Sequence, residues 1–289
     1  MKKLLIVALA IIPVLFACKK SSTTPVTNLE TPKYAAQAAK VEIKKPIKVT
    51  SKKGDVEIKK IDFLRSGRYV AEAAIVTKAD ENTITLTGTW TYTEGKGYEV
   101  KGDIEATVAV SSASSSEASV TITTTAEGAQ TSEAKVEETK VQAGSTEDKI
   151  YRTWKIDHII LSEFSKLGST SVRATSISTL VTEIKNKGIN LGNAEAKLLE
   201  HEINEITFDE GVMLILFKNG TSFKGNLPNL GASGSATKFT FDLSSLSDKI
   251  GNVSGTIDFK GDNAVVSINV PDIESIGSGK AEVTLVQVK

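Results

Sequence analysis

Hydrophobic and polar residues alternate along most of this 289-residue chain, a pattern typical of β-strands with one buried face. Between about residues 41 and 141 the alternation recurs in short runs separated by glycine or by Asp/Asn turns. One of these runs changes phase at Lys59-Lys60. Another keeps strict period two before a glycine turn and places four residues on one side: Ile84, Leu86, Trp90 and Tyr92. Residues 34–144 therefore predict a β-rich domain, an antiparallel meander or sandwich.

The rest of the chain, residues 145–289, mixes strands with two short helices. Helical spacing of i, i+3, i+4 and i+7 predicts a first helix near residues 172–187, from Ile177, Leu180, Val181 and Ile184. Asn193 is a suitable cap for a second helix near residues 194–202. Strands then return, and Asn219-Gly220 suits the type I′ turn of a tight hairpin. The chain is thus expected to be mainly β (β+α), with the helices early in its second domain.

The first eighteen residues differ from everything after them. Lys2 and Lys3 precede an apolar run from Leu4 to Phe16, and the only cysteine of the chain is Cys18. This is the layout of a secretory signal peptide, and the run is too short to span a bilayer, which needs roughly 20 apolar residues. Leu15-Phe16-Ala17-Cys18 resembles the bacterial lipobox, which implies cleavage after residue 17 and acylation of Cys18. The alternative is an ordinary signal peptide followed by a lone thiol.

Residues 19–25 are polar, small and broken by Pro25, so residues 18–33 are expected to form a flexible tether between the lipid and the folded chain. Surface-exposed lipoproteins of Bacteroidota often carry acidic residues directly after the cysteine, and here the first acidic residue is Glu30. That resemblance favours an outer-membrane lipoprotein that faces the periplasm, with the cell surface as the alternative. The membrane lipid on Cys18 is then the first expected partner.

The charge balance bears on the other partners. The chain has 35 basic and 35 acidic side chains, so its formal net charge is zero. Nucleic-acid-binding proteins usually present a strongly basic face, so we do not expect a nucleic-acid partner.

Several short motifs resemble one group of proteins. Gly88-Thr89-Trp90 has the form of the Gly-x-Trp element of lipocalin-like domains. Thr153-Trp154-Lys155, Lys187-Gly188-Ile189 and Ile206-Thr207-Phe208 are similar to segments of uncharacterised lipocalin-like lipoprotein families of Bacteroidota. The resemblance covers about residues 149–289 and implies a lipocalin-like β-barrel-type fold for that half. Arg152-Thr153 departs from the lipocalin pattern, because glycine is expected before the tryptophan.

The sequence offers little catalytic chemistry. His158 and His201 are the only histidines, and His201 lies among Glu200, Glu202 and Glu205 on what we interpret as a solvated face. The Gly-x-Ser-x-Gly, phosphate-loop and His-Glu-x-x-His motifs do not occur. We therefore expect no enzyme, no metal and no cofactor. Paired carboxylates such as Glu137-Glu138 are interpreted as solubilising charges.

The leading hypothesis is a non-enzymatic, lipid-anchored protein that binds a small hydrophobic ligand or an envelope partner. If there is a ligand pocket, we expect it to be lined by inward-facing residues: Trp154, Ile156, Leu214, Leu216, Phe239 and, in the first half, Trp90. Tyr92 and Tyr98 could line a ligand mouth beside the glycine turn. One alternative is an assembly lipoprotein that pairs through exposed strand edges of its β-rich first half. Another is an enzyme that acts on glycans or lipids.

Overall fold

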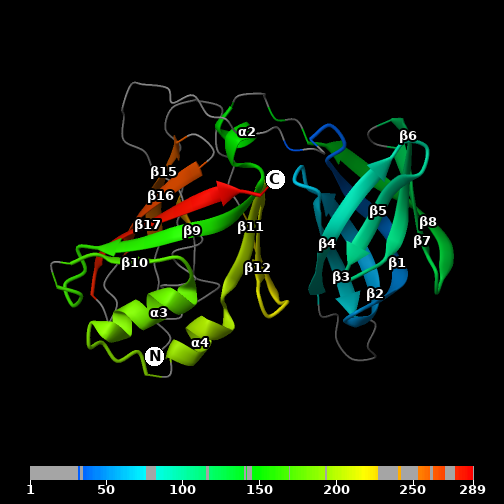
Figure 1. Cartoon of the computed structure of the whole chain (residues 1–289). Coiled ribbons are helices and arrows are strands. Elements are labelled where there is room, and N and C mark those ends of the chain that lie inside the picture. The colour runs from blue at the N-terminus through cyan, green and yellow to red at the C-terminus, as the bar shows by residue number, and fades with distance from the viewer. Residues whose placement is uncertain are drawn as a thin grey trace. The chain divides into compact units, whose positions relative to one another are not determined.

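The chain forms two units, one of residues 31–141 and one that includes residues 142–289. Figure 1 shows both in the computed structural model. The structure describes residues 32, 35–75, 83–114, 117–139, 141, 145–168, 170–192, 194–226, 240–241, 253–260, 263–270 and 277–288. Each unit is treated by itself below.

The first unit is a closed antiparallel barrel in which each strand pairs with its neighbours along the chain. The barrel closes where the first strand pairs with the last, from Ala39 opposite Glu138 to Ile43 opposite Ala134. The strands appear in blue to green in Figure 1. They are β1 (Ala39–Ser51), β2 (Gly54–Phe63), β3 (Arg68–Ile75), β4 (Thr83–Thr93), β5 (Gly97–Gly102), β6 (Ala106–Ser114), β7 (Glu117–Thr124) and β8 (Gly128–Glu138).

The alternation in the sequence explains the barrel core. In β2, Val56 and Ile58 point inward, the register shifts between Ile58 and Lys60, and Ile61 and Phe63 then continue the inward face. This β-bulge is the physical cause of the phase change at Lys59-Lys60, because one extra residue moves the following side chains to the other face. The predicted meander is confirmed, and its strands close into a barrel.

Gly88 is required by the close approach of β4 and β5. It lies directly opposite Gly102, and a Cβ atom on Gly88 would sit 2.2 Å from the carbonyl oxygen of Lys101 and 2.9 Å from the Cα of Gly102. Real Cβ atoms do not approach backbone atoms so closely, so any side chain at Gly88 would push the two strands apart. The glycine of the Gly-x-Trp motif therefore has a packing role in this barrel.

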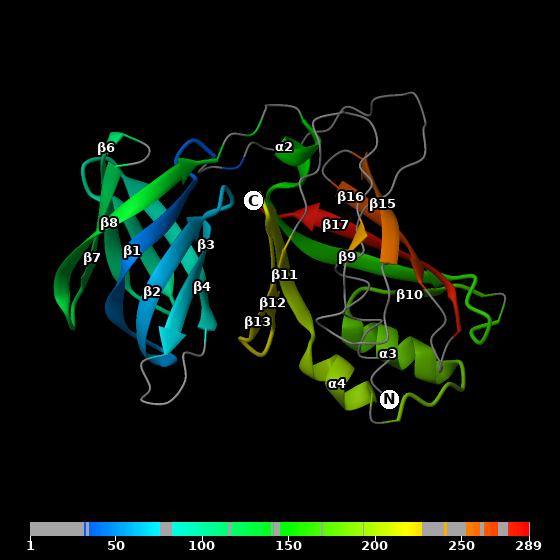
Figure 2. The same ribbon diagram turned by 180° about the vertical axis from the view of Figure 1, so that it is seen from behind.

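The second unit is built on a sheet with the strand order β13-β12-β11-β9-β17-β16-β15-β14, and β10 also pairs with β9. Figure 2 shows this sheet from behind, with α3 and α4 beside one another. Its elements are α2 (Thr146–Ile150), β9 (Thr153–Ser162), β10 (Val172–Ala174), α3 (Ile177–Asn186), α4 (Ala194–Glu200), β11 (Ile203–Asp209), β12 (Val212–Phe217), β13 (Ser222–Asn226), β14 (Thr240–Phe241), β15 (Val253–Lys260), β16 (Asn263–Val270) and β17 (Gly279–Gln287).

The mainly β class is confirmed, but the closed barrel lies in a different place from the one we expected. We expected it in residues 145–289, and it is formed by residues 39–138. Alternation within strands could not locate it, because closure depends on pairing between the first and last strands of a meander. Those strands, β1 and β8, are far apart in the sequence.

The first helix prediction is right in its buried face, and both helix predictions are partly wrong in their bounds. Ile177, Leu180, Val181 and Ile184 are all buried on α3, as their spacing predicts. The helix begins at Ile177 and not near residue 172, because Ser176 caps it and Val172–Ala174 pair with β9 as a strand. The second helix ends at Glu200, and its predicted cap, Asn193, lies outside the described residues.

Candidate functional site

The predicted pocket residues of the second unit do not share one face of the sheet. Trp154 lies opposite Ile206, which lies opposite Ile215. Thr207 lies opposite both Thr153 and Leu214. Directly opposed residues point to the same face and successive residues to opposite faces. Trp154 and Leu214 therefore lie on opposite faces of the sheet.

The same reasoning places the other two described members of that set. Ile156 is two residues from Trp154 and shares its face, whereas Leu216 shares the face of Leu214. The prediction that all four residues line a single pocket is thus wrong. Register was the missing information, because β12 is apolar on both faces and its sequence does not show which residues point which way. Phe239 and Cys18 lie outside the described residues.

Trp154 is part of the core. Its side chain is fully buried, and its indole N–H donates a hydrogen bond of 2.9 Å to the backbone oxygen of Ile150, the last residue of α2. Such a bond satisfies the polar end of a buried indole and ties the short helix to β9. Ile156 and Leu216 are half-buried, and Leu214 is fully buried.

Trp90 belongs to an aromatic cluster inside the barrel. Its ring centroid is 5.7 Å from that of Phe63 and 5.3 Å from that of Tyr98, both edge to face, and Phe63 stacks on Tyr98 at 3.8 Å. The Trp90 indole N–H donates to the backbone oxygens of Leu64 at 3.1 Å and Arg68 at 2.8 Å. The cluster therefore fills this part of the barrel with its own side chains, as small barrels often do.

The aromatic cluster reaches solvent at one end of the barrel, which we call the barrel mouth: Tyr92, Tyr98 and Glu138. Tyr92 is 40% exposed, and its ring and that of Tyr98 lie edge to face with centroids 5.2 Å apart. Tyr98 is nearly buried and donates its hydroxyl to the backbone oxygen of Gln37 at 2.9 Å. Burial, and then the neighbouring Tyr92 and Glu138, raise the pKa of Tyr98 to about 12. Its phenol thus stays protonated at neutral pH and acts as a donor.

Glu138 was missed as a site residue, although its position carries a signal. Ala134 is in the barrel core and Val136 packs against it, so the inward phase of β8 continues to Glu138. Its neighbour Glu137 has the opposite phase and pairs with Lys135 at 2.5 Å on the outer surface. Alternation separates the two carboxylates that we had interpreted together as solubilising charges.

His158 lies in a polar network on the sheet of the second unit. Its Nδ1 is 2.6 Å from Oδ2 of Asp157, and its Nε2 is 3.2 Å from Oγ1 of Thr284. Asp157 is the extra residue of a bulge in β9, since Thr284 lies opposite His158 and Leu285 opposite Ile156. A carboxylate can hold an imidazole in the tautomer that accepts a proton from a hydroxyl, so such a series can activate a nucleophile. Thr284, however, is a buried residue in the middle of β17, where its hydroxyl bridges two strands of the sheet.

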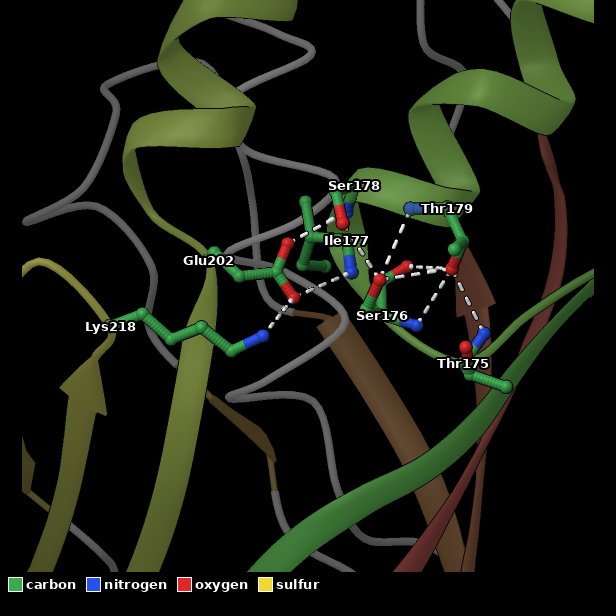
Figure 3. Close-up of polar contacts among 7 residues, drawn as sticks. All are labelled: Thr175, Ser176, Ile177, Ser178, Thr179, Glu202 and Lys218. Atoms are coloured by element: carbon green, nitrogen blue, oxygen red, sulfur yellow. Dashed lines mark hydrogen bonds and ion pairs between the residues drawn. The ribbon is translucent and has the colours of Figure 1, made fainter.

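Two of the three acidic residues near His201 in the sequence, Glu202 and Glu205, contact other groups. Figure 3 shows Glu202 at the start of α3, where its carboxylate accepts hydrogen bonds from the backbone N–H groups of Ile177 at 3.2 Å and Ser178 at 2.7 Å. Lys218 Nζ lies 3.6 Å from the same carboxylate. Oε1 of Glu205 lies 3.8 Å from Nζ of Lys155. A carboxylate at a helix N-terminus satisfies free N–H groups and suits the helix dipole, so Glu202 joins α3 to β11 and β12.

The described residues include no group of three or more His, Cys, Asp or Glu side chains arranged to hold a metal ion. None of the helices in the described part of the chain is long and apolar enough to cross a membrane.

Comparisons with known proteins add no family. No protein-family model and no curated protein matches the sequence. Among solved structures, the chain is similar to a protein of unknown function from the DUF3598 family of Nostoc punctiforme PCC 73102, with 8% sequence identity and a TM-score of 0.25. That match covers 90% of this chain and 100% of the other. A TM-score this low assigns neither fold nor function.

Proposed function

We propose that this chain is a lipoprotein of the bacterial envelope, held to the membrane by lipid on Cys18, and that its folded units bind and do not catalyse. The observation that carries the proposal is Cys18 itself, the only cysteine, placed directly after an apolar run and a small residue. A polar tether through residue 33 follows, and the first described strand begins at Ala39. This arrangement would let a lipid hold the protein without entering the fold.

The test of the anchor is Cys18→Ser in cells labelled with palmitate. A hydroxyl cannot replace the thiol that accepts the diacylglycerol as a thioether, so the variant should carry no label and keep its signal peptide. Wild type should be labelled and should fractionate with the outer membrane. Ser21→Cys in the Cys18→Ser background is the matched control, because it restores a thiol at the wrong distance from the apolar run. Label on Cys18→Ser would overturn the anchor.

The proposal places the protein on the periplasmic side of the outer membrane. The basis is the polar segment after Cys18, which has no acidic residue before Glu30. Protease added to intact cells should leave the chain whole, and it should be digested after the outer membrane is permeabilised. Digestion in intact cells would place it on the cell surface.

Binding of a small hydrophobic ligand is the first form of the proposed activity. Packing of Phe63, Trp90 and Tyr98 against one another argues against a large ligand in that part of the barrel. The half-buried Ile156, on the Trp154 face of the second unit, is a better candidate contact. Native mass spectrometry of the chain purified from its own membrane tests this idea. A mass that corresponds to the lipidated chain alone, with no bound hydrophobic dye, would count against a ligand carrier.

Binding of an envelope protein is the second form, and one observation favours a particular strand. The barrel removes the edges of the first half that we had considered for pairing, because a closed sheet leaves no unpaired strand. β13 ends the strand order of the described sheet in the second unit. Crosslinking in intact cells should then capture a single abundant partner at residues 222–226. Capture through the barrel instead would exclude pairing at β13.

A further inference from the structure

The barrel mouth has features that neither the lipid anchor nor the barrel core requires. Tyr92 continues the inward face of β4 beyond Trp90, yet it is exposed, as only one other large hydrophobic side chain is in the described part of the chain. Its ring is held in place by Tyr98, which is itself stacked on Phe63. An exposed aromatic face on a rigid aromatic support is a preorganised contact surface, since little side-chain freedom is lost when a ligand binds.

Glu138 places a carboxylate at the mouth. Glu138 has the inward phase of β8 and is exposed, and Tyr98 interacts electrostatically with it. The backbone oxygen of Gln37 also lies there, within hydrogen-bond distance of the Tyr98 hydroxyl. The nearest lysine on the same strand, Lys135, points to the outer surface and pairs with Glu137. Tyrosine faces, a carboxylate and a carbonyl oxygen all attract positive charge.

We infer that the barrel mouth binds a small organic cation of the quaternary ammonium class, with Tyr92 as the aromatic face and Glu138 as the counter-charge. Quaternary ammonium groups are recognised by aromatic rings because the electron-rich face attracts a cation whose methyl groups cannot donate strong hydrogen bonds. The ends of β-barrels are also among the usual places for ligand sites. The inference goes beyond the proposed anchor and does not depend on Cys18.

The experiment uses the full chain in detergent with choline as the probe and 3,3-dimethylbutan-1-ol as its neutral isostere. The chain has five tyrosines, so ring signals of a tyrosine-labelled sample are few, and Tyr92→Phe assigns the one at the mouth. Choline up to about 50 mM should shift the Tyr92 and Tyr98 signals in a saturable way. The neutral isostere should shift them much less at the same concentration.

Variants separate the two proposed contributions. Tyr92→Leu should weaken choline binding about threefold to fivefold, whereas Tyr92→Phe keeps the aromatic face and should bind within about twofold of wild type. Glu138→Gln should weaken binding about twofold to fivefold. Glu137→Gln is the matched control, one residue away with the opposite phase, and should leave binding unchanged. Both altered residues of the mouth are exposed, so the variants are expected to fold, which far-ultraviolet circular dichroism checks.

Three results would overturn the inference. The first is no saturable shift with choline. The second is an equal shift with the neutral isostere, which would mean that the mouth recognises apolar shape and not charge. The third is equal weakening by Glu137→Gln and Glu138→Gln, which would indicate general surface electrostatics. Choline binding that persists in Cys18→Ser would show that the mouth works without the anchor.

Discussion

The barrel of residues 31–141 and the sheet of residues 142–289 bury their apolar residues differently. In barrel strands such as β8, buried and exposed positions alternate: Ser132 and Ala134 are buried and their neighbours are not. In the sheet, β12 is buried at every position except Leu216, which is half-buried. In β8 one face meets the core and the other meets solvent, whereas both faces of β12 are covered. β3 is an exception within the barrel, because Val70 and Ala74 are buried beside its inward-facing residues.

This difference decides what a pattern of residues can reveal. Alternation in a barrel strand indicates which residues point inward. Closure of the barrel then gives every strand two neighbouring strands. A strand covered on both faces carries no such signal, so the faces of Leu214 and Ile215 become known only through their partners on β11. The predictions below test whether the two units also behave differently, starting with the largest expected effect.

Trp90→Ala and Trp154→Ala should each destabilise mainly the unit that holds the tryptophan. Both indoles are buried, and replacing such a residue by alanine costs about 3–5 kcal/mol of unfolding free energy. The chain has two tryptophans, one in each unit, so each variant leaves the other as a fluorescent reporter. In urea, the unfolding transition that Trp154 fluorescence reports should have the same midpoint in Trp90→Ala as in Trp90→Phe. A large parallel shift of that transition would mean that the units unfold together.

Gly88→Ala should damage the barrel through its backbone. The new Cβ would meet the Lys101 oxygen and the Gly102 Cα, so β4 and β5 must separate, at a cost of about 1–3 kcal/mol. Thr89→Ala is the control, because Thr89 is exposed and its loss should stay within about 0.5 kcal/mol. The urea midpoints of the two variants are compared by Trp90 fluorescence in a Trp154→Phe background. Equal midpoints for the two variants would contradict the role of close approach.

The fold was more predictable from the sequence than the site. The buried face of α3 and the bulge after Ile58 follow from local spacing alone. The pairing of β1 with β8, the opposed faces of Trp154 and Leu214, and the contact of His158 with Thr284 all join distant segments, so no local pattern could reveal them. Glu138 lies between these cases, because alternation places it on the inner face once the barrel is known to close.

Glu202→Ala should loosen the start of α3 without disturbing its buried face. The carboxylate accepts hydrogen bonds from the N–H groups of Ile177 and Ser178, and loss of a comparable helix cap costs about 1 kcal/mol. Hydrogen exchange at these two amides should become faster, while amides in the barrel should not change. Glu200→Ala removes a nearby exposed carboxylate and serves as the control. Equal protection of the Ile177 and Ser178 amides from hydrogen exchange in the two variants would show that Glu202 does not cap this helix in addition to Ser176.

The smallest expected effect concerns Glu127, which joins the β7–β8 turn to β1. Its carboxylate accepts hydrogen bonds from the Thr124 hydroxyl and from the Thr50 hydroxyl and N–H, and these bonds hold the pKa of Glu127 below its ordinary value. A carboxyl group whose pKa is lower in the folded state stabilises the fold above its unfolded pKa, and this contribution disappears as the pH falls through the folded pKa.

Wild type should therefore exceed Glu127→Gln in stability at pH 7, and the difference should shrink as the pH falls through the pKa of the native carboxyl. Urea unfolding at pH 7 and at a series of lower pH values, followed by Trp90 fluorescence in a Trp154→Phe background, measures the difference in the unit concerned. Glu105→Gln is the control, since Glu105 is an exposed carboxylate on the same barrel. A Glu127 difference that is constant with pH, or equal to that of Glu105, would show that the hydrogen bonds to Thr50 and Thr124 do not help to fasten the turn to β1.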